Sequence, residues 1–302
     1  MPKATFFLNI GLPKTGTTWL YDVLNHHSDV QLPYDKEIRY FWVKEHLPSM
    51  DISQFLFNNH WHFKEKRYLF LYNLLQSTRP LLKLKKVDKK RIQWYFNYFF
   101  GSKNDQWYFD LFPENQATGD ITPKYCELSK HSIKYIKSIL PDAQLILILR
   151  DPIEREWSRT KMNLLKKRGK SNIHDIDENL VFKHFEDPHQ LQSNDYTYLI
   201  QKWLTYFSKD QLLIIYFDEI QKDAHSVYQK VCQFLNIEAI DLPQINQKSN
   251  KGVEQEIPDK YLYRLVELNY RYIEKFYKHH PNDYSKIWLE RYQLISKGLD
   301  KI

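Results

Sequence analysis

The sequence predicts an α/β fold with a central parallel β-sheet and helices on both faces. The apolar run Phe6–Ile10 is typical of a buried strand, and a glycine-bracketed turn and a helical pattern follow it. The run Leu145–Leu149 is continuously apolar, as in parallel strands that are covered on both sides. A third apolar run, Leu212–Phe217, precedes a helical pattern at Ala224–Leu235 and so completes another strand–helix unit.

The turn after the first strand is suited to binding an anion. Gly11 and Gly16 bracket it, and apolar residues from Trp19 to Leu24 then follow a helical spacing. The first backbone N–H groups of a helix lack intrahelical partners, and the helix dipole adds positive potential there. This strand–turn–helix unit therefore predicts a phosphate-like ligand, although an ordinary connection remains the alternative.

The same turn resembles a Walker A motif but differs from it in the position of the lysine. A P-loop nucleotide triphosphatase has lysine after the second glycine, where this chain has Thr17, and the lysine here is Lys14. The segment PKTGTTWL at 13–20 resembles the 5′-phosphosulfate loop of the sulfotransferases, which use 3′-phosphoadenosine 5′-phosphosulfate (PAPS) as donor. The resemblance implies that the donor is bound by loop residues Lys14, Thr15, Gly16, Thr17, Thr18 and Trp19.

The composition favours an anionic partner. The 302 residues include 44 Lys and Arg against 37 Asp and Glu, a net charge of +7. This charge suits a nucleotide, an acidic or sulfated glycan, or a membrane surface, whereas no motif specifies nucleic acid. Cys126 and Cys232 are the only cysteines, so no disulfide framework is expected, and no metal site is predicted.

The beginning of the chain leads to an expectation about its location. The first strand starts at about Phe6, which leaves no room for a signal peptide. No apolar run approaches the roughly 18–20 residues that span a bilayer. Animal Golgi sulfotransferases have a membrane anchor and a stem before this loop. We therefore expect a soluble, cytoplasmic protein without a transmembrane segment, of microbial or viral source.

A candidate catalytic base follows the first helix and a short strand expected at 30–33. The segment Lys36–Phe41, KEIRYF, is similar to one in the glycan-modifying sulfotransferases, where the glutamate of a Lys-Glu pair is the base. The resemblance implies that Glu37 is the base, and we place Arg39 at the acceptor side. The alternative is that Glu37 only forms a solvated ion pair with Lys36.

Residues 43–105 form a predicted helical insertion outside the family pattern. Many aromatic residues surround a basic stretch, Lys83–Arg91. Because the insertion directly follows Glu37, we expect it to shape the acceptor cleft and the basic stretch to attract the acceptor. Aromatic rings stack on sugars and cations pair with carboxylate or sulfate, so a carbohydrate is favoured. A lipid headgroup surface and a satellite core are the alternatives.

The segment Thr118–Tyr125, TGDITPKY, resembles the Gly-Glu-x-(Thr/Ser)-Pro-x-Tyr segment of the glycan sulfotransferases. Asp120 stands where Glu is usual, and Ile121 stands where several animal members have a catalytic-site lysine. This departure removes one positive group and argues against a close match to the heparan sulfate enzymes. Asp120 is nevertheless predicted to contact the acceptor.

A second phosphate site is predicted where the strand 144–149 ends. Ligands of open α/β sheets bind at the carboxyl ends of strands, and Arg150 lies there. The segment RDPIEREWS at 150–158 resembles the family's 3′-phosphate segment, RDPxxRxxS. A guanidinium suits a phosphate, and the Ser158 hydroxyl two turns into the helix can reach another oxygen. An ion pair at the helix start is the alternative for Arg150.

Segments near the C-terminus add one candidate loop and two helices. The segment Gln247–Gly252 resembles a loop that closes over the nucleotide in this family, with Lys251 and Gly252 as donor contacts. Helices are expected at about Asp259–His279 and Ser285–Ile295, and they carry no functional motif.

Together, residues 5–42, 107–160 and 193–253 resemble the PAPS-dependent sulfotransferases, closest in pattern to the glycan (heparan sulfate-type) and bacterial members. The resemblance implies one P-loop-like domain over 1–302 and in-line sulfuryl transfer to a hydroxyl or amine, without a metal. Glu37 takes the acceptor proton, Lys14 stabilises the leaving phosphate, and 3′,5′-adenosine bisphosphate (PAP) is the product. The acceptor is a glycan or a small hydroxyl compound. A P-loop-like nucleotide kinase and a non-catalytic nucleotide- or glycan-binding protein are the alternatives.

Overall fold

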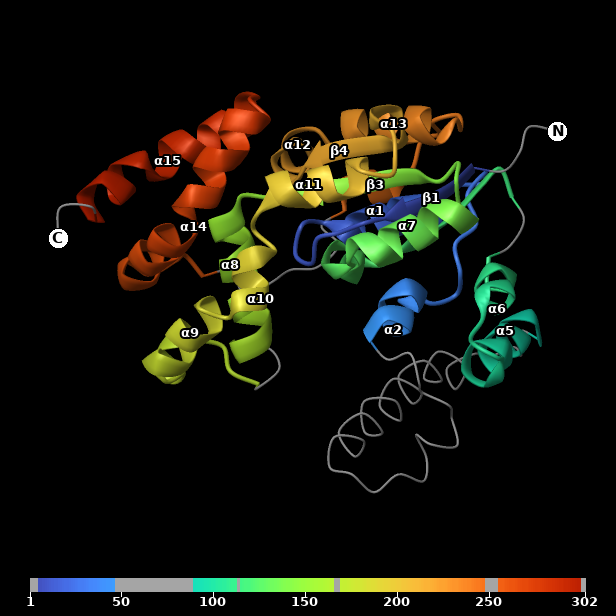
Figure 1. Ribbon diagram of the computed structural model, residues 1–302, viewed down its shortest axis with the longest axis horizontal. Helices are drawn as coiled ribbons and strands as arrows, with labels where there is room; N and C mark the ends of the chain where they lie inside the picture. Colours follow the sequence, from blue (N-terminus) through green and yellow to red (C-terminus); the bar gives the residue numbers. More distant parts are fainter. Residues whose placement is uncertain (1–4, 47–88, 113–114, 166–168, 248–254, 300–302) are drawn as a thin grey trace, which may run out of the picture.

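The computed structural model describes residues 5–46, 89–112, 115–165, 169–247 and 255–299. Its centre is a four-stranded parallel sheet with strand order β2-β1-β3-β4 (Figure 1). The strands are β1 (Thr5–Asn9), β2 (Ala117–Ile121), β3 (Gln144–Leu149) and β4 (Leu212–Tyr216). The predicted α/β class with a central parallel sheet is therefore confirmed.

Both faces of the sheet are buried, which explains the continuous apolar run of β3. Leu145, Leu147 and Leu149 belong to one hydrophobic cluster, while Ile146 and Ile148 belong to another on the opposite face. Side chains alternate between the faces of a strand, so a strand covered on both sides has apolar residues at every position. The prediction of helices on both faces is confirmed by the elements that supply these clusters.

One cluster is completed by α1 (Thr17–Asn25) and α13 (Ala224–Leu235). The other is completed mainly by α7 (Lys130–Ile139), α8 (Pro152–Thr160), α11 (Tyr196–Leu204), α14 (Asp259–His279) and α15 (Asp283–Leu299). The long helices α14 and α15 lie together at one end of the molecule, beyond α8 (Figure 1).

The remaining helices are shorter. They are α2 (Tyr40–His46), α5 (Lys89–Phe100), α6 (Asp105–Asp110), α9 (Glu178–Phe185), α10 (Pro188–Gln192) and α12 (Phe217–Lys222). Turns of 3-10 helix occur at Pro123–Glu127, Ile173–Asp175, Lys209–Gln211 and Pro243–Asn246, and a π-helical turn at Lys161–Leu165. In the parts of the chain that are described, no helix combines the length and apolar character needed to cross a bilayer.

Two local expectations differ from the structure, and one is only partly covered. The strand expected at 30–33 is a single bridge between Val30 and Ala117, whereas β2 was not anticipated because its residues lack an apolar pattern. The helical character of the insertion is confirmed at α5 and α6, while 47–88, with most of the basic stretch, lie outside the described residues. Cys126 and Cys232 are both free and buried.

Candidate active site

Two predicted site residues, Lys14 and Arg150, lie just after the carboxyl ends of parallel strands. The loop that contains Lys14 follows β1, Thr122 follows β2, Arg150 follows β3 and Phe217 follows β4. Since all four strands are parallel, their carboxyl ends share one edge of the sheet. Segments more than 100 residues apart in sequence are thereby brought together.

The first turn of α1 leaves its amide groups available to an anion. Gly16 is the N-cap residue, with φ 100°, and a glycine has no side chain that could cap the helix. A Cβ atom at this position would lie 2.9 Å from Cδ2 of Phe217, so both the backbone conformation and the packing require glycine. The N–H groups of the first turn, including that of Thr17, are the expected anion donors.

Two residues of the predicted donor loop have buried side chains with hydrogen-bond partners inside the protein. The Thr15 hydroxyl is fully buried and donates to the Leu12 carbonyl at 2.8 Å. The Trp19 side chain is also buried, and its indole N–H donates to the Ile245 carbonyl at 2.9 Å. Both side chains stabilise the loop and its surroundings, so only the backbone of these residues can contact a donor.

Arg150 is placed beside the first loop. Its Nη1 atom lies 3.4 Å from the Lys14 carbonyl oxygen, and its guanidinium stacks 4.7 Å from the centre of the Phe217 ring. Nη2 lies 3.3 Å from the Glu154 carboxylate, so the alternative ion pair is present as well. Such partly exposed pairs contribute little to stability, and a phosphate can compete for the guanidinium. Phe217 was missed in the sequence, where its position after a strand was the available signal.

The other predicted donor contacts are on or near α8. Ser158 lies one turn after Glu154 on that helix and is partly exposed. Lys251 and Gly252 lie outside the described residues. The described residue that follows them, Gln255, accepts hydrogen bonds at its carbonyl from Trp157 at 2.9 Å and from Lys161 at 3.0 Å.

Arg155, the second arginine of the 150–158 segment, has an internal role. It is 1 % exposed and donates to Glu156 at 2.8 Å and to Ser193 at 2.7 Å, and it also contacts Asn194. Arg155 therefore joins α8 to the chain that leads into α11 and does not face the donor side.

Glu37 lies in a loop with unusual backbone geometry. Its carboxylate pairs with the Arg39 guanidinium, whose Nε lies 3.1 Å away, so Arg39 takes the place that the alternative interpretation gave to Lys36. Lys14, Glu37 and Arg39 have φ values of 72°, 66° and 61°, in the left-handed region. Non-glycine residues adopt this region rarely, and such residues cluster at functional sites. Both predicted catalytic residues are among them.

Lys36 connects the two segments that are predicted to be catalytic, and it was not anticipated as a site residue. Its ammonium group donates to the Thr18 hydroxyl at 3.1 Å. Burial lowers the pKa of Lys36, and the nearby Glu37 carboxylate opposes that shift. Through this contact the segment that carries Glu37 lies against the first turn of α1. The sequence could not reveal the contact, because it depends on how residues 30–37 fold back onto the first helix.

Asp120 supports the Glu37 loop from inside. It is fully buried, and its carboxylate accepts hydrogen bonds from the hydroxyls of Tyr108, Thr122 and Tyr125 at 3.2, 2.6 and 2.5 Å. The Thr122 hydroxyl in turn accepts the Arg39 backbone N–H at 3.2 Å. The predicted contact between Asp120 and the acceptor is therefore corrected, because a carboxylate with this burial and these partners holds the loop.

The buried Asp120 predicts a specific pH dependence of stability. Burial raises its pKa from 3.8 to about 6, against the hydrogen bonds that favour the charged form. The folded protein then binds this proton more tightly than the unfolded chain, so the stabilisation is complete below about pH 4 and is lost as the pH rises through about 6. Asn cannot titrate, so the stability of wild type relative to Asp120→Asn should fall between pH 4 and 7. Urea unfolding at several pH values measures it, and a pH-independent difference would contradict the prediction.

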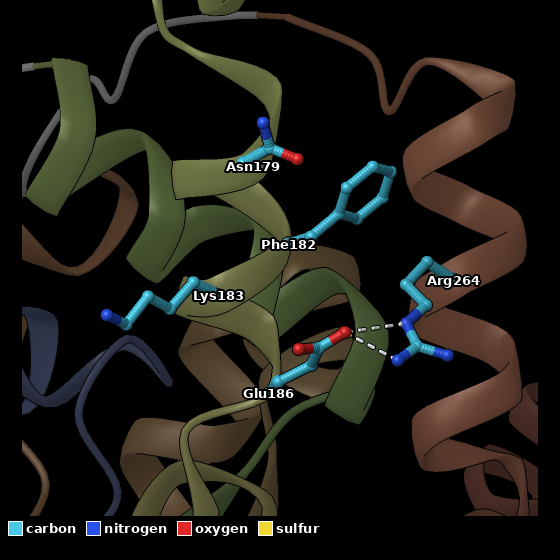
Figure 2. A pocket seen from close by; sticks show the side chains of 5 residues that line it. All are labelled: Asn179, Phe182, Lys183, Glu186 and Arg264. Carbon is cyan, nitrogen blue, oxygen red and sulfur yellow. Dashed lines mark hydrogen bonds and ion pairs between the residues drawn. The ribbon is translucent and has the colours of Figure 1, made fainter.

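A hollow on the surface lies apart from this site. It is lined by Asn179, Phe182 and Lys183 of α9, by Glu186 just after that helix and by Arg264 of α14, and Glu186 pairs with Arg264 across it (Figure 2). Neither helix carries a predicted site residue. Among the described residues, no three His, Cys, Asp or Glu side chains are grouped to hold a metal ion.

Comparison with known proteins identifies the chain's relatives. A model of the sulfotransferase family matches residues 7–241. Mouse carbohydrate sulfotransferase 15 is 27 % identical over 266 residues, covering 76 % of this chain and 43 % of the relative. Mouse bifunctional heparan sulfate N-deacetylase/N-sulfotransferase 4 is 29 % identical over 147 residues, covering 45 % of this chain and 17 % of the relative. The chain thus spans less than half the length of these curated relatives.

Solved structures share the fold. A sulfotransferase from Alicyclobacillus acidocaldarius matches with a TM-score of 0.57 and 17 % identity, covering 95 % of this chain and 99 % of that one. The sulfotransferase domain of the Synechococcus PCC 7002 olefin synthase matches with a TM-score of 0.50 and 15 % identity, covering 90 % and 94 %. The curated relatives are mouse proteins and the solved structures are bacterial, so the comparisons specify neither a source nor a location, and the expected microbial or viral source and cytoplasmic location stay unsupported.

The family match and the fold agree with the resemblance found in the sequence. The matched residues extend over well over half of the 302-residue chain and include Lys14, Glu37 and Arg150. This agreement counts against a P-loop-like kinase. The chain belongs to the sulfotransferase family.

Proposed function

We propose that this protein transfers a sulfuryl group from PAPS to a hydroxyl or amine of a carbohydrate-containing acceptor. The observation that carries the proposal is the contact between Arg150 and the Lys14 carbonyl, 136 residues apart in sequence. It joins the segment that resembles a 3′-phosphate site to the loop that resembles a 5′-phosphosulfate site. A donor with anionic groups at both ends of its ribose suits this pair of segments.

The residues present fit such a donor. The first turn of α1 offers backbone N–H groups and the positive end of the helix dipole, and Gly16 adds no side chain there. Arg150 is held at its side by Phe217, and its side chain is 20 % exposed. In the proposal, the α1 turn binds the 5′ group, while Arg150 and Ser158 bind the 3′-phosphate and so select PAPS over ATP.

Each catalytic residue has a stated role. Bound PAPS supplies the sulfuryl group, whose sulfur forms a bond to the acceptor as its bond to the phosphate oxygen breaks. Glu37 takes the acceptor's proton. Lys14 and the α1 amides stabilise the charge that develops on the departing phosphate. Lys36, through its contact with Thr18, adds a further positive group between the two segments.

The acceptor class rests on the relatives and on the surface near Glu37. The names of the two mouse relatives specify carbohydrate and heparan sulfate. In this chain, α2 follows the Glu37 loop and carries Trp42, a partly exposed ring that stacks on His46 at 4.5 Å and has Lys124 5.8 Å away. An aromatic face with a nearby cation suits an anionic sugar.

The donor specificity is tested by thermal stabilisation. We expect PAP to raise the melting temperature without magnesium, and ATP at the same concentration to raise it far less, since stabilisation follows ligand concentration over Kd. Differential scanning fluorimetry with and without magnesium measures both. Equal shifts with ATP, or an absolute need for magnesium, would contradict the proposed donor. Turnover with labelled PAPS and a panel of glycans then separates an enzyme from a non-catalytic binding protein.

Arg150→Ala should weaken PAP binding selectively. The substitution removes a charge-assisted contact worth about 1.5–3 kcal/mol, which corresponds to roughly tenfold or more in Kd. Binding of 5′-adenosine monophosphate (AMP), which lacks the 3′-phosphate, should change little. Isothermal titration calorimetry measures both, with Arg271→Ala on the exposed side of α14 as the control that removes one guanidinium elsewhere. Equal weakening of the two nucleotides would remove Arg150 from the 3′-phosphate site.

A further inference from the structure

The C-terminal helix α15 contacts the turn that carries Arg150, although α15 lies outside the family match at 7–241. Nη1 of Arg291 and the hydroxyl of Tyr292 both donate to Oδ2 of Asp151, at 2.8 and 2.9 Å. We propose that Arg291 and Tyr292 are positioning residues that hold Asp151 and thereby orient Arg150 toward the donor's 3′-phosphate. The inference rests on the proposed function.

Asp151 is the centre of this arrangement. It is 1 % exposed, and its second oxygen, Oδ1, accepts the backbone N–H groups of Ile153 at 3.0 Å and Glu154 at 3.4 Å. One carboxylate therefore caps the start of α8 and also binds α15. A buried carboxylate depends strongly on its partners, because removing one partner leaves the other charge uncompensated. The position of Asp151 is thus set by both helices.

The peptide unit that joins Arg150 to Asp151 is held by another helix as well. The Tyr196 hydroxyl of α11 donates to the Arg150 carbonyl at 2.7 Å. With the Asp151 side chain held by α15, this peptide unit is constrained from both α11 and α15. Because the direction of a side chain follows its backbone, a shift at Asp151 moves the guanidinium away from Phe217 and the Lys14 carbonyl. Small misplacements of binding groups have large effects on affinity and rate.

The helix α15 is itself firmly attached at this edge of the sheet. Trp288 is fully buried, with its ring 6.1 Å from that of Phe276 in α14 and 5.6 Å from that of Tyr216 at the end of β4. Asn282, just before α15, donates to the Tyr216 hydroxyl at 2.8 Å. Tyr216 directly precedes Phe217 in sequence, so the helix is anchored at the strand end that leads into Phe217.

The test compares nucleotides that differ only in the 3′-phosphate. Arg291→Ala and Tyr292→Phe are titrated with PAP and with AMP in the full-length protein. We expect PAP affinity to fall roughly threefold to tenfold, because both residues act on Arg150 only through Asp151. The affinity for AMP should be nearly unchanged. Arg291→Lys should restore much of the loss. Lys286→Ala, an exposed residue of the same helix whose side chain is 58 % exposed, is the control for the lost charge.

The outcomes separate this inference from the proposed function. Wild-type protein that fails to bind PAP overturns the proposed function, and the inference with it. If wild type binds PAP but folded Arg291→Ala and Tyr292→Phe bind it equally well, the inference alone is overturned. Equal loss for PAP and AMP also overturns it, because the effect is then general. Should Arg291→Ala not fold, Tyr292→Phe decides, since it removes one hydroxyl and keeps the ring.

Discussion

Glu37→Gln is expected to lower turnover with PAPS by roughly 10²–10⁴-fold, the usual contribution of general-base catalysis. The amide keeps the shape of the side chain but cannot take the acceptor's proton. The carboxylate is 27 % exposed and paired with Arg39 in a loop held by Thr122, so the substitution should leave the fold intact. Initial rates with labelled donor measure the loss, and PAP titration should give wild-type affinity.

The control for Glu37 is an equally conservative change away from the site. Glu267→Gln on α14 alters a side chain that is 53 % exposed and should leave turnover unchanged. If Glu37→Gln keeps near-normal turnover, the residue is only the partner of Arg39, and the base must be another group. Asp120 is then a poor replacement because it is fully buried, and the next candidates are His26 and His27, which follow the first helix. Of these, His27 is also buried, with its Nε2 2.8 Å from the Glu238 carbonyl oxygen.

Glu156→Ala should destabilise the protein by about 3–5 kcal/mol, the cost of breaking a buried ion pair by removing one partner. Glu156 is 1 % exposed and lies between two buried guanidiniums, with Arg155 at 2.8 Å and Arg159 at 2.6 Å. Without it, both positive groups lose their buried countercharge. Chemical denaturation followed by circular dichroism measures the change in the free energy of unfolding.

Two further variants test the origin of this effect. Glu156→Gln keeps the volume and some hydrogen bonding but not the charge, so its loss should be smaller than that of Glu156→Ala. Glu290→Ala removes a carboxylate that is 61 % exposed and 3.8 Å from Lys286, and should change stability by less than about 0.5 kcal/mol. A loss below about 1 kcal/mol for Glu156→Ala would mean that the cluster is not held by its charges.

Local pattern was sufficient for the main elements. The bounds of α13 and α14 match the predicted 224–235 and 259–279, because an amphipathic helix repeats its apolar face along its own sequence. The strand β2 was not predicted because ATGDI has no such pattern. It forms as a strand because β1 pairs with it in parallel along its whole length, and that pairing is a long-range contact.

The sequence by itself determined which groups stand at the ends of the strands and helices. Neighbouring residues determine the loop of Lys14 and Gly16 and the position of Arg150 after β3. The hydropathy and the glycine positions of these neighbours can be read directly from the sequence. Only the tertiary structure decided what each group faces. In the folded chain Asp120 is buried and Lys36 donates a hydrogen bond to Thr18. Arg291 of α15 binds Asp151, which is 140 residues away in sequence. Such contacts depend on how helices pack on the two faces of the sheet, and no local pattern encodes that packing.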